Sequence, residues 1–197
     1  MPDVPTRPTP LLRGERVYLR VVEPEDADTI HGWYAHADTA RLMGELPRSL
    51  ARRRADADSA TREVGRDWYA FVICRIEDDT PVGRMDLFEI DRVNGSAGFG
   101  MAIGEHAQRG QGLGTDAVNV VLDFCFGQLR LERVWLVTDE VNERAQHVYR
   151  KAGLVEEGRL RRAFFQDGRF QDDVRMAILR SEWEALDRKR SWDYAVR

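Results

Sequence analysis

Three glycines in the segment Gln108-Arg109-Gly110-Gln111-Gly112-Leu113-Gly114-Thr115 could form an anion-binding loop. The glycines occupy every second position, 110, 112 and 114. The segment follows an apolar run over 97–103 and leads into a helical pattern that begins near Leu113. Glycine lets the backbone turn tightly and bring its N–H groups close to a ligand. The N-terminus of the following helix adds unpaired donors and a partial positive charge. This spacing predicts a site for the pyrophosphate of a nucleotide-like cofactor, with contacts from Arg109 through Thr115.

The spacing of the glycines distinguishes between the known classes of nucleotide-binding loop. A dinucleotide-binding fold places G-x-G-x-x-G early in a β-α-β unit, whereas this chain has G-x-G-x-G well past its middle. A P-loop requires Gly-Lys followed by Ser or Thr, and no lysine lies near the loop. A surface turn before a helix would also use glycines. The arrangement R-x-x-G-x-G, from Arg109 through Gly112 to Gly114, resembles the acyl-CoA pyrophosphate loop of the GNAT N-acyltransferase superfamily.

A second segment strengthens this resemblance. Asn142-Glu143-Arg144-Ala145-Gln146-His147-Val148-Tyr149-Arg150-Lys151-Ala152-Gly153-Leu154 resembles the N-x-x-[AS]-x-x-x-Y-x-K-x-G-F segment of the superfamily, with leucine where phenylalanine is common. The two segments occur in the family's order, separated by a helix and a strand. The stretches 19–27, 157–173 and 182–183 look like the RimJ/RimL-type branch, which includes acetyltransferases of ribosomal-protein N-termini, drugs and small amines.

The resemblance implies a single-domain α/β (α+β) fold whose mixed, strongly twisted sheet splays between the 97–103 and 133–138 strands. The pantetheine arm of acetyl-CoA would lie in this gap against exposed backbone from Met101 to Ile103. Asn142 would bind the arm through its amide, and Ala145 would leave space for it. The implied reaction transfers an acetyl group from acetyl-CoA to a primary amine, by direct attack in a ternary complex. The amine would belong to a protein N-terminus or to a small molecule.

Tyr149 is the expected proton donor to the leaving thiolate. Family members place at this position a tyrosine whose hydroxyl reaches the CoA sulfur, and a phenol with a pKa of about 10 suits that task. A tyrosine packed into the core would look the same in sequence. Asn142 could likewise serve as a helix cap, alone or in addition to binding the cofactor. No cysteine or serine arrangement indicates a covalent mechanism.

The group that takes the proton from the amine is less well indicated. Many relatives carry a glutamate early in the strand before the loop, but the matching position here is Gly98. Glu105 and His106, at the other end of that strand, are candidates, with a chain of waters as the alternative. The absent glutamate keeps open a catalytically inactive acyl-CoA-binding regulatory or sensor domain. A nucleotide-binding protein of another fold is a third interpretation.

Hydrophobic patterns predict the elements that would position these segments. We expect one domain over 13–190, between an N-terminal tail at 1–12 and a C-terminal tail at 191–197, with a sheet of about seven strands. The helix after the glycine loop should be the best buried. The expected strands are 16–22, 68–76, 81–90, 96–103, 133–138, 154–165 and 170–179, and the expected helices are 24–36, 49–62, 113–129, 143–152 and 182–189.

Composition limits the class of partner. The chain has 197 residues, of which 43% are hydrophobic and 32% charged, and a net charge of −4, as is typical of one globular domain. Such a chain offers no basic surface for nucleic acid. No segment resembles a signal peptide or a membrane span, so we expect a cytoplasmic protein. Cys74 and Cys125 are expected as buried thiols, and the four histidines lack metal-ligand spacing.

The acceptor would be selected by loops around 36–50, 88–96 and 162–170. Acidic residues near the cleft would favour cationic amines. Arg161 and Arg162 would instead favour an acidic acceptor or a larger acyl group such as succinyl. Many members of the superfamily dimerise, so a homodimer is a further expectation.

Overall fold

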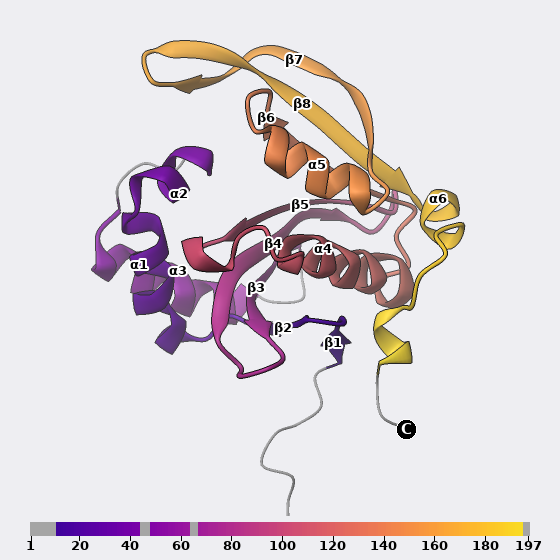
Figure 1. Ribbon diagram of the computed structural model, residues 1–197, viewed down its shortest axis with the longest axis horizontal. Coiled ribbons are helices and arrows are strands. Elements are labelled where there is room, and N and C mark those ends of the chain that lie inside the picture. Colours follow the sequence, from indigo (N-terminus) through magenta and orange to yellow (C-terminus); the bar gives the residue numbers. More distant parts are fainter. Residues whose placement is uncertain (1–10, 44–47, 64–66, 195–197) are drawn as a thin grey trace, which may run out of the picture.

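The computed structural model describes residues 11–43, 48–63 and 67–194, and within these ranges the chain forms one eight-stranded sheet with helices on both faces (Figure 1). The strands are β1 (Leu12–Arg13), β2 (Val17–Val21), β3 (Tyr69–Arg75), β4 (Pro81–Asp91), β5 (Ser96–Ile103), β6 (Arg133–Asp139), β7 (Val155–Gln166) and β8 (Arg169–Leu179). The helices are α1 (Ala27–Ala35), α2 (Ala37–Leu42), α3 (Leu50–Glu63), α4 (Leu113–Asp123), α5 (Glu143–Lys151) and α6 (Arg180–Glu184). Short turns of helix are η1 (Pro24–Asp26), η2 (His106–Gln108), the π-helical η3 (Phe124–Gln128) and η4 (Ser191–Asp193).

The sheet splits between its two parallel strands. Its order is β1-β2-β3-β4-β5-β6-β8-β7, and all neighbours are antiparallel except β5 and β6. These two strands pair only over Ser96–Gly98 and Arg133–Trp135. Beyond that point β5 continues with β4, and β6 continues with β8, so the twist of the sheet carries the two halves apart. The expected splay between the 97–103 and 133–138 strands is confirmed.

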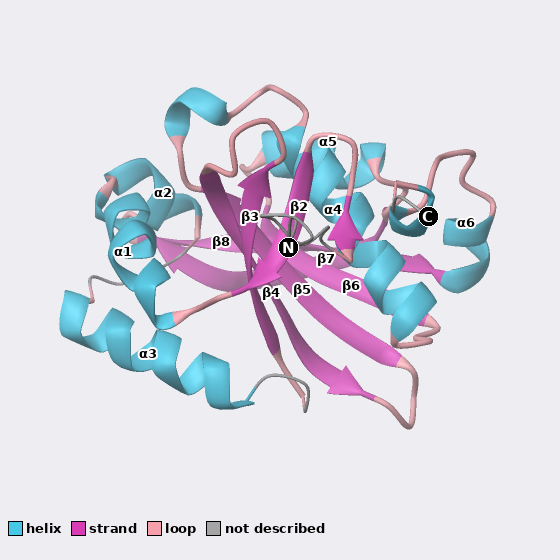
Figure 2. Cartoon of the chain, turned by 90° about the horizontal axis from the view of Figure 1, so that it is seen from below, coloured by secondary structure: helices cyan, strands magenta, loops and turns pink. Residues whose placement is uncertain are grey.

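Two hydrophobic clusters hold helices to the two faces of the sheet. The larger cluster joins α4 and α5 to β2–β6 and β8, and the smaller joins α1 and α3 to β2 and β3. Figure 2 shows the strands fanning out between α1–α3 on one side and α4–α6 on the other. Because both faces of β3 are covered, the run from Ala70 to Cys74 is buried without alternation. Among the described residues, no helix is long and apolar enough to cross a membrane.

The N-terminal region differs from the expected elements. The helix expected at 24–36 is η1 followed by α1, and a further helix, α2, follows it directly. His36, with ψ of 122°, interrupts the helical backbone between α1 and α2. The two-residue β1 extends the sheet to eight strands by pairing with β2.

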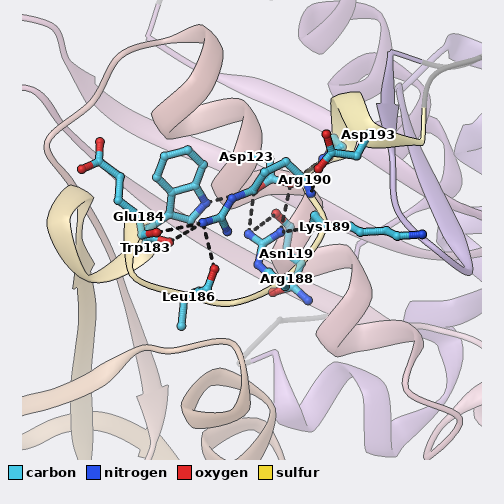
Figure 3. A network of polar contacts seen from close by, with 10 residues as sticks. Asn119, Asp123, Trp183, Glu184, Leu186, Arg188, Lys189, Arg190 and Asp193 are labelled. Atoms are coloured by element: carbon cyan, nitrogen blue, oxygen red, sulfur yellow. Dashed lines mark hydrogen bonds and ion pairs between the residues drawn. The ribbon is translucent and has the colours of Figure 1, made fainter. Parts of the chain in front are cut away.

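The C-terminal end also departs from the expectation. The helix expected at 182–189 is α6, which ends at Glu184, and η4 lies in the region expected as a tail. The chain turns there because Asp123, which is 2% exposed, accepts hydrogen bonds from Trp183 Nε1 (2.9 Å) and Arg188 Nη2 (2.6 Å) (Figure 3). Asp123 also accepts from the Ser191 N–H at 2.7 Å. Both cysteines are free and buried, as expected.

Candidate active site

A cavity of about 640 Å³ occupies the gap between β5 and β6. One wall is the strand segment Gly100–Ile103, and the other is Val137–Asp139. The glycine loop and α5 close one end, and Thr39, Met43 and Phe164 lie among the remaining lining residues. Two of the loops expected to select the acceptor therefore contribute to the wall, whereas the residues 88–96 do not, and neither do Arg161 and Arg162.

The glycine loop has the conformation that its sequence predicts. Gly110 and Gly112 have φ of 84° and 81°, and Gly112 caps α4. Helix geometry leaves the first N–H groups of α4 without intrahelical partners, and they lie next to Gly110, Gly112, Gly114 and Thr115, which all line the cavity. A Cβ at Gly110 or Gly112 would meet no neighbour closer than 3.8 Å, so the loop also has open space for a ligand. These features fit the pyrophosphate of acetyl-CoA.

Two predicted contacts lie beside this cavity rather than in its wall. Leu113 is buried in the core beneath the loop. The Gln111 side chain donates to the Ala107 carbonyl, and the Gln111 carbonyl accepts from Arg16 Nη1 at 2.9 Å. Leu113 and Gln111 therefore hold the loop through contacts with the rest of the protein.

Arg109 lines the cavity but is bonded to the protein. Its Nε donates to the Ile103 carbonyl at 2.9 Å, and its Nη2 donates to Thr39 Oγ1 at 2.7 Å. Its backbone N–H donates to the His106 carbonyl. Arg109 thus ties the loop to the end of β5 and to α2. Burial, and then the charge of Arg144, lower the pKa of its guanidinium, so a bound anion would relieve the electrostatic repulsion.

Helix α5 brings the second predicted group of residues to the same cavity. Asn142, Ala145 and Tyr149 all line it. Asn142 Oδ1 caps α5 by accepting from the Ala145 N–H at 3.1 Å, which confirms the capping role and leaves the side-chain NH₂ for another partner. Met101 and Ile103 line the cavity and lie beside the start of α4, since a Cβ at Gly114 would lie 3.3 Å from the Met101 methyl and 3.9 Å from Ile103 Cγ1.

Tyr149 is the buried phenol of the cavity. Its ring packs edge-to-face on Phe99, with 5.9 Å between centroids. Burial raises the pKa of its hydroxyl to about 12, so the group is protonated throughout the physiological range. A protonated phenol at the cavity wall can donate a proton to a leaving thiolate. Tyr149 is therefore both a core residue and a cavity residue, two roles that the sequence left as alternatives.

The candidate bases lie elsewhere. Glu105 and His106 line a second cavity of about 310 Å³, together with His36, Ala37, Asp38 and Gly104. The structure does not bring Glu105 together with Tyr149, because the chain turns away through η2 after β5 ends. At Gly98 a Cβ would lie 2.5 Å from Phe88 Cε2 and 2.8 Å from Trp135 Cζ2. The aromatic pair of Phe88 and Trp135 fills the space that a glutamate side chain would need there.

Sequence reasoning missed other basic and acidic residues of the wall. Arg144, His147 and Lys151 recur at intervals of three and four along α5, so they share one face of the helix. Arg144 Nη2 would lie 3.8 Å from a Cβ at Gly110, which places a cation beside the glycine loop. Helical periodicity within the segment 142–154 could have revealed this face. Asp139 and Asp173 also line the cavity, and only the register of β6 with β8 brings them together.

Comparisons with known proteins agree with this geometry. The model of the acetyltransferase (GNAT) domain family matches residues 16–155. A spermidine N(1)-acetyltransferase of Escherichia coli is 31% identical over 169 residues, covering 86% of this chain and 89% of the relative. A putative ribosomal N-acetyltransferase of Bacillus subtilis is 27% identical over 184 residues, covering 87% and 95%.

A solved structure has the same fold. The spermidine N-acetyltransferase of Vibrio cholerae in complex with CoA and spermine superposes with a TM-score of 0.78 at 29% identity, covering 85% of this chain and 98% of that one. These relatives are named as acetyltransferases, so the interpretation as a binding domain without catalysis finds no support among them. The family match and the shared fold mean that the chain belongs to the GNAT acetyltransferases and is an N-acetyltransferase with acetyl-CoA as its cosubstrate.

Proposed function

We propose that this enzyme transfers the acetyl group to a primary amine bound in the cavity between β5 and β6, with Tyr149 as the proton donor. The observation that carries the proposal is that one cavity joins the glycine loop, the exposed edge of β5 and the buried phenol of Tyr149. The remaining volume, between Thr39, Phe164 and Asp173, is available for the amine.

The loop end of the cavity would hold the cosubstrate. The N–H groups from Gly110 through Thr115 would receive the pyrophosphate, with Arg144 supplying a cation beside Gly110. Met101 and Ile103 would offer backbone groups to the pantetheine arm, Asn142 its free amide, and Ala145 the space. The remaining predicted contacts, Arg109, Gln111 and Leu113, would hold the loop in place through the bonds and burial described above.

The protein has two tasks in this reaction: to orient the amine against the thioester and to transfer protons. Acetyl-CoA supplies an activated carbonyl, and holding the amine against it could contribute about 7–11 kcal/mol. Tyr149 would protonate the sulfur as the thiolate leaves. If Glu105 is the base, as the sequence suggested, a water relay must connect the larger cavity to the smaller one. Tyr149 lines the larger cavity, whereas Glu105 lines the smaller.

The acceptor class is inferred from the relatives and from the cavity. The relatives include a spermidine N(1)-acetyltransferase and a putative ribosomal N-acetyltransferase, and these names do not single out the RimJ/RimL-type branch. The carboxylates of Asp139 and Asp173 in the cavity favour a cationic small amine over a protein N-terminus. A homodimer in the cytoplasm remains part of the proposal.

Removing the Tyr149 hydroxyl tests this function. The substitution Tyr149→Phe should lower kcat with an amine acceptor by about 100-fold or more, because general acid catalysis typically contributes that much. CoA affinity should stay within about twofold of wild type, since the ring remains. Release of free thiol and isothermal titration with CoA provide the two readouts.

The matched control is Tyr69→Phe, which removes a hydroxyl from a partly buried ring packed between Phe71 and Phe124, away from the cavity. This variant should retain kcat. If Tyr149→Phe behaves like Tyr69→Phe, Tyr149 is not the proton donor. If the wild-type protein binds CoA but releases no thiol with any primary amine, the proposed reaction is wrong.

A further inference from the structure

We infer that Asp139, Asp173 and Gln171 form a subsite for a second cationic group of the acceptor, so that the enzyme prefers diamines and polyamines to monoamines. The inference rests on the proposed function and adds to it the residues that recognise the acceptor. It concerns the wall of the cavity formed by β6 and β8.

Two carboxylates face each other across these strands. Asp139 and Asp173 are directly opposite in the antiparallel register of β6 and β8, and both line the cavity. Like charges directly opposite on one face of a sheet destabilise it, because the side chains leave the strands side by side. A cation between them would turn this repulsion into attraction.

No such cation comes from the described part of the chain. No arginine, lysine or histidine there forms an ion pair with either carboxylate, and Asp139 Oδ1 accepts a hydrogen bond from the Val141 N–H at 3.1 Å. Arg175 is the next residue on the Asp173 face of β8, but its guanidinium lies over the Trp135 ring, 4.4 Å from the centroid. The pair is therefore left for a ligand to neutralise.

A buried amide on the same face independently indicates a ligand. Gln171 is 4% exposed, and both its Oε1 and its Nε2 lack hydrogen-bond partners. Its side chain leaves β8 on the same face as Asp173, because alternate residues of a strand share a face. Phe164, its partner across β7 and β8, lines the cavity. A buried amide without a partner is costly, and an ammonium or amine nitrogen would satisfy its oxygen.

These groups form a row suited to an extended polyamine. Asp173 and Gln171 lie about 7 Å apart along β8, and Asp139 stands across from the first of them. Ammonium groups donate to carboxylate and amide oxygens, whereas neutral or acidic acceptors would leave both carboxylates unpaired. Asp139 and Asp173 line the cavity that also contains Tyr149, and Gln171 pairs with Phe164, another lining residue, so one end of the acceptor can be bound while the other reacts.

The test compares spermidine with n-butylamine, which has no second charge. For the wild-type enzyme, kcat/KM should be higher with spermidine. In Asp173→Asn the ratio of the two kcat/KM values should fall about 10-fold or more, chiefly through KM for spermidine, since one of two carboxylates is lost. Asp173→Glu should restore most of the ratio. Asp187→Asn, which removes an exposed carboxylate outside the cavity, should leave the ratio unchanged.

Calorimetry separates failure of the subsite from failure of the proposed reaction. Spermidine should bind wild-type protein in the presence of CoA, and binding should weaken about 10-fold in Asp173→Asn and in Gln171→Leu. An unchanged ratio together with unchanged binding in both variants overturns the subsite. If no amine is acetylated by the wild type but spermidine binding depends on Asp173, the subsite stands and the proposed function is wrong.

Discussion

Gly110 and Gly168 share a backbone conformation but lie in different surroundings. Their φ values are 84° and 77°, and a Cβ at either would meet open space, with only Arg144 at 3.8 Å from Gly110. Valine at either position should cost about 1–2 kcal/mol of unfolding free energy, because a side chain disfavours left-handed backbone. Only Gly110→Val, in the loop, should also weaken CoA binding, by about 10-fold or more, as measured by calorimetry.

The pair of variants separates strain from binding. Gly168→Val lies in the turn between β7 and β8 and carries the same conformational penalty without touching the cavity. If both variants weaken CoA binding equally, the loss reflects general destabilisation. If neither does, the pyrophosphate does not lie on the loop.

The ionisation of Asp173 should appear in the stability of the protein. Burial, then Asp139 and Asp172, raise the pKa of its carboxyl above the usual 3.8. The folded chain therefore binds more protons than the unfolded chain between the two pKa values. The contribution of this carboxyl to stability is greatest below its pKa in the unfolded chain. It is lost as the pH rises through its pKa in the folded chain. At neutral pH the ionised side chain destabilises the fold.

The substitution Asp173→Asn should consequently stabilise the ligand-free protein at pH 7, and the gain should shrink as the pH falls towards 4. Urea unfolding of both proteins across this range measures the difference. Spermidine should raise the unfolding temperature of the wild type more than that of the variant. A variant less stable than the wild type at pH 7 would mean that Asp173 has a stabilising partner in the folded protein.

At the scale of elements, the strands and helices with a clear hydrophobic pattern could be predicted from the sequence. Elements that depend on long-range contacts could not. The seven longer strands lie close to their predicted ranges because alternation or an apolar run marks each of them. Helix α2 has only six residues and little apolar pattern. Long-range contacts hold it instead, between Thr39 and Arg109 and between Arg41 and Asp167. Such contacts leave no periodic trace in the sequence.

The same distinction applies to the candidate site. The glycine loop and the Asn142–Tyr149 helix are contiguous segments whose local conformation follows from their own residues. The cavity brings them together because β5 and β6 separate, as the resemblance implied. Asp139 and Asp173 meet only through the pairing of two distant strands. Glu105 is close to the loop in sequence, but the turn at η2 carries it to another cavity.

In the whole molecule, α4 connects the two ends of the described chain to the glycine loop. Near its start, Asp116 accepts hydrogen bonds from the N–H groups of Glu15, Arg16 and Val17. At its end, Asp123 binds the C-terminal segment through Trp183, Arg188 and Ser191. The two aspartates are two helical turns apart, so both terminal segments hold the helix whose N-terminus forms the loop.

Asp123 should therefore contribute much more to stability than an ordinary surface carboxylate. It is 2% exposed and pairs with Arg188 at 2.6 Å, so Asp123→Asn leaves a largely buried cation without its charge partner and should cost about 3–5 kcal/mol of unfolding free energy in urea. Glu184→Gln is the control, because Glu184 is largely exposed and its 3.7 Å pair with Arg180 should contribute about 0–1 kcal/mol. Equal effects of the two substitutions would mean that the C-terminal segment packs on α4 without depending on Asp123. A selective loss, accompanied by easier proteolysis after residue 185, would show that this carboxylate holds the C-terminal segment against the helix behind the active site.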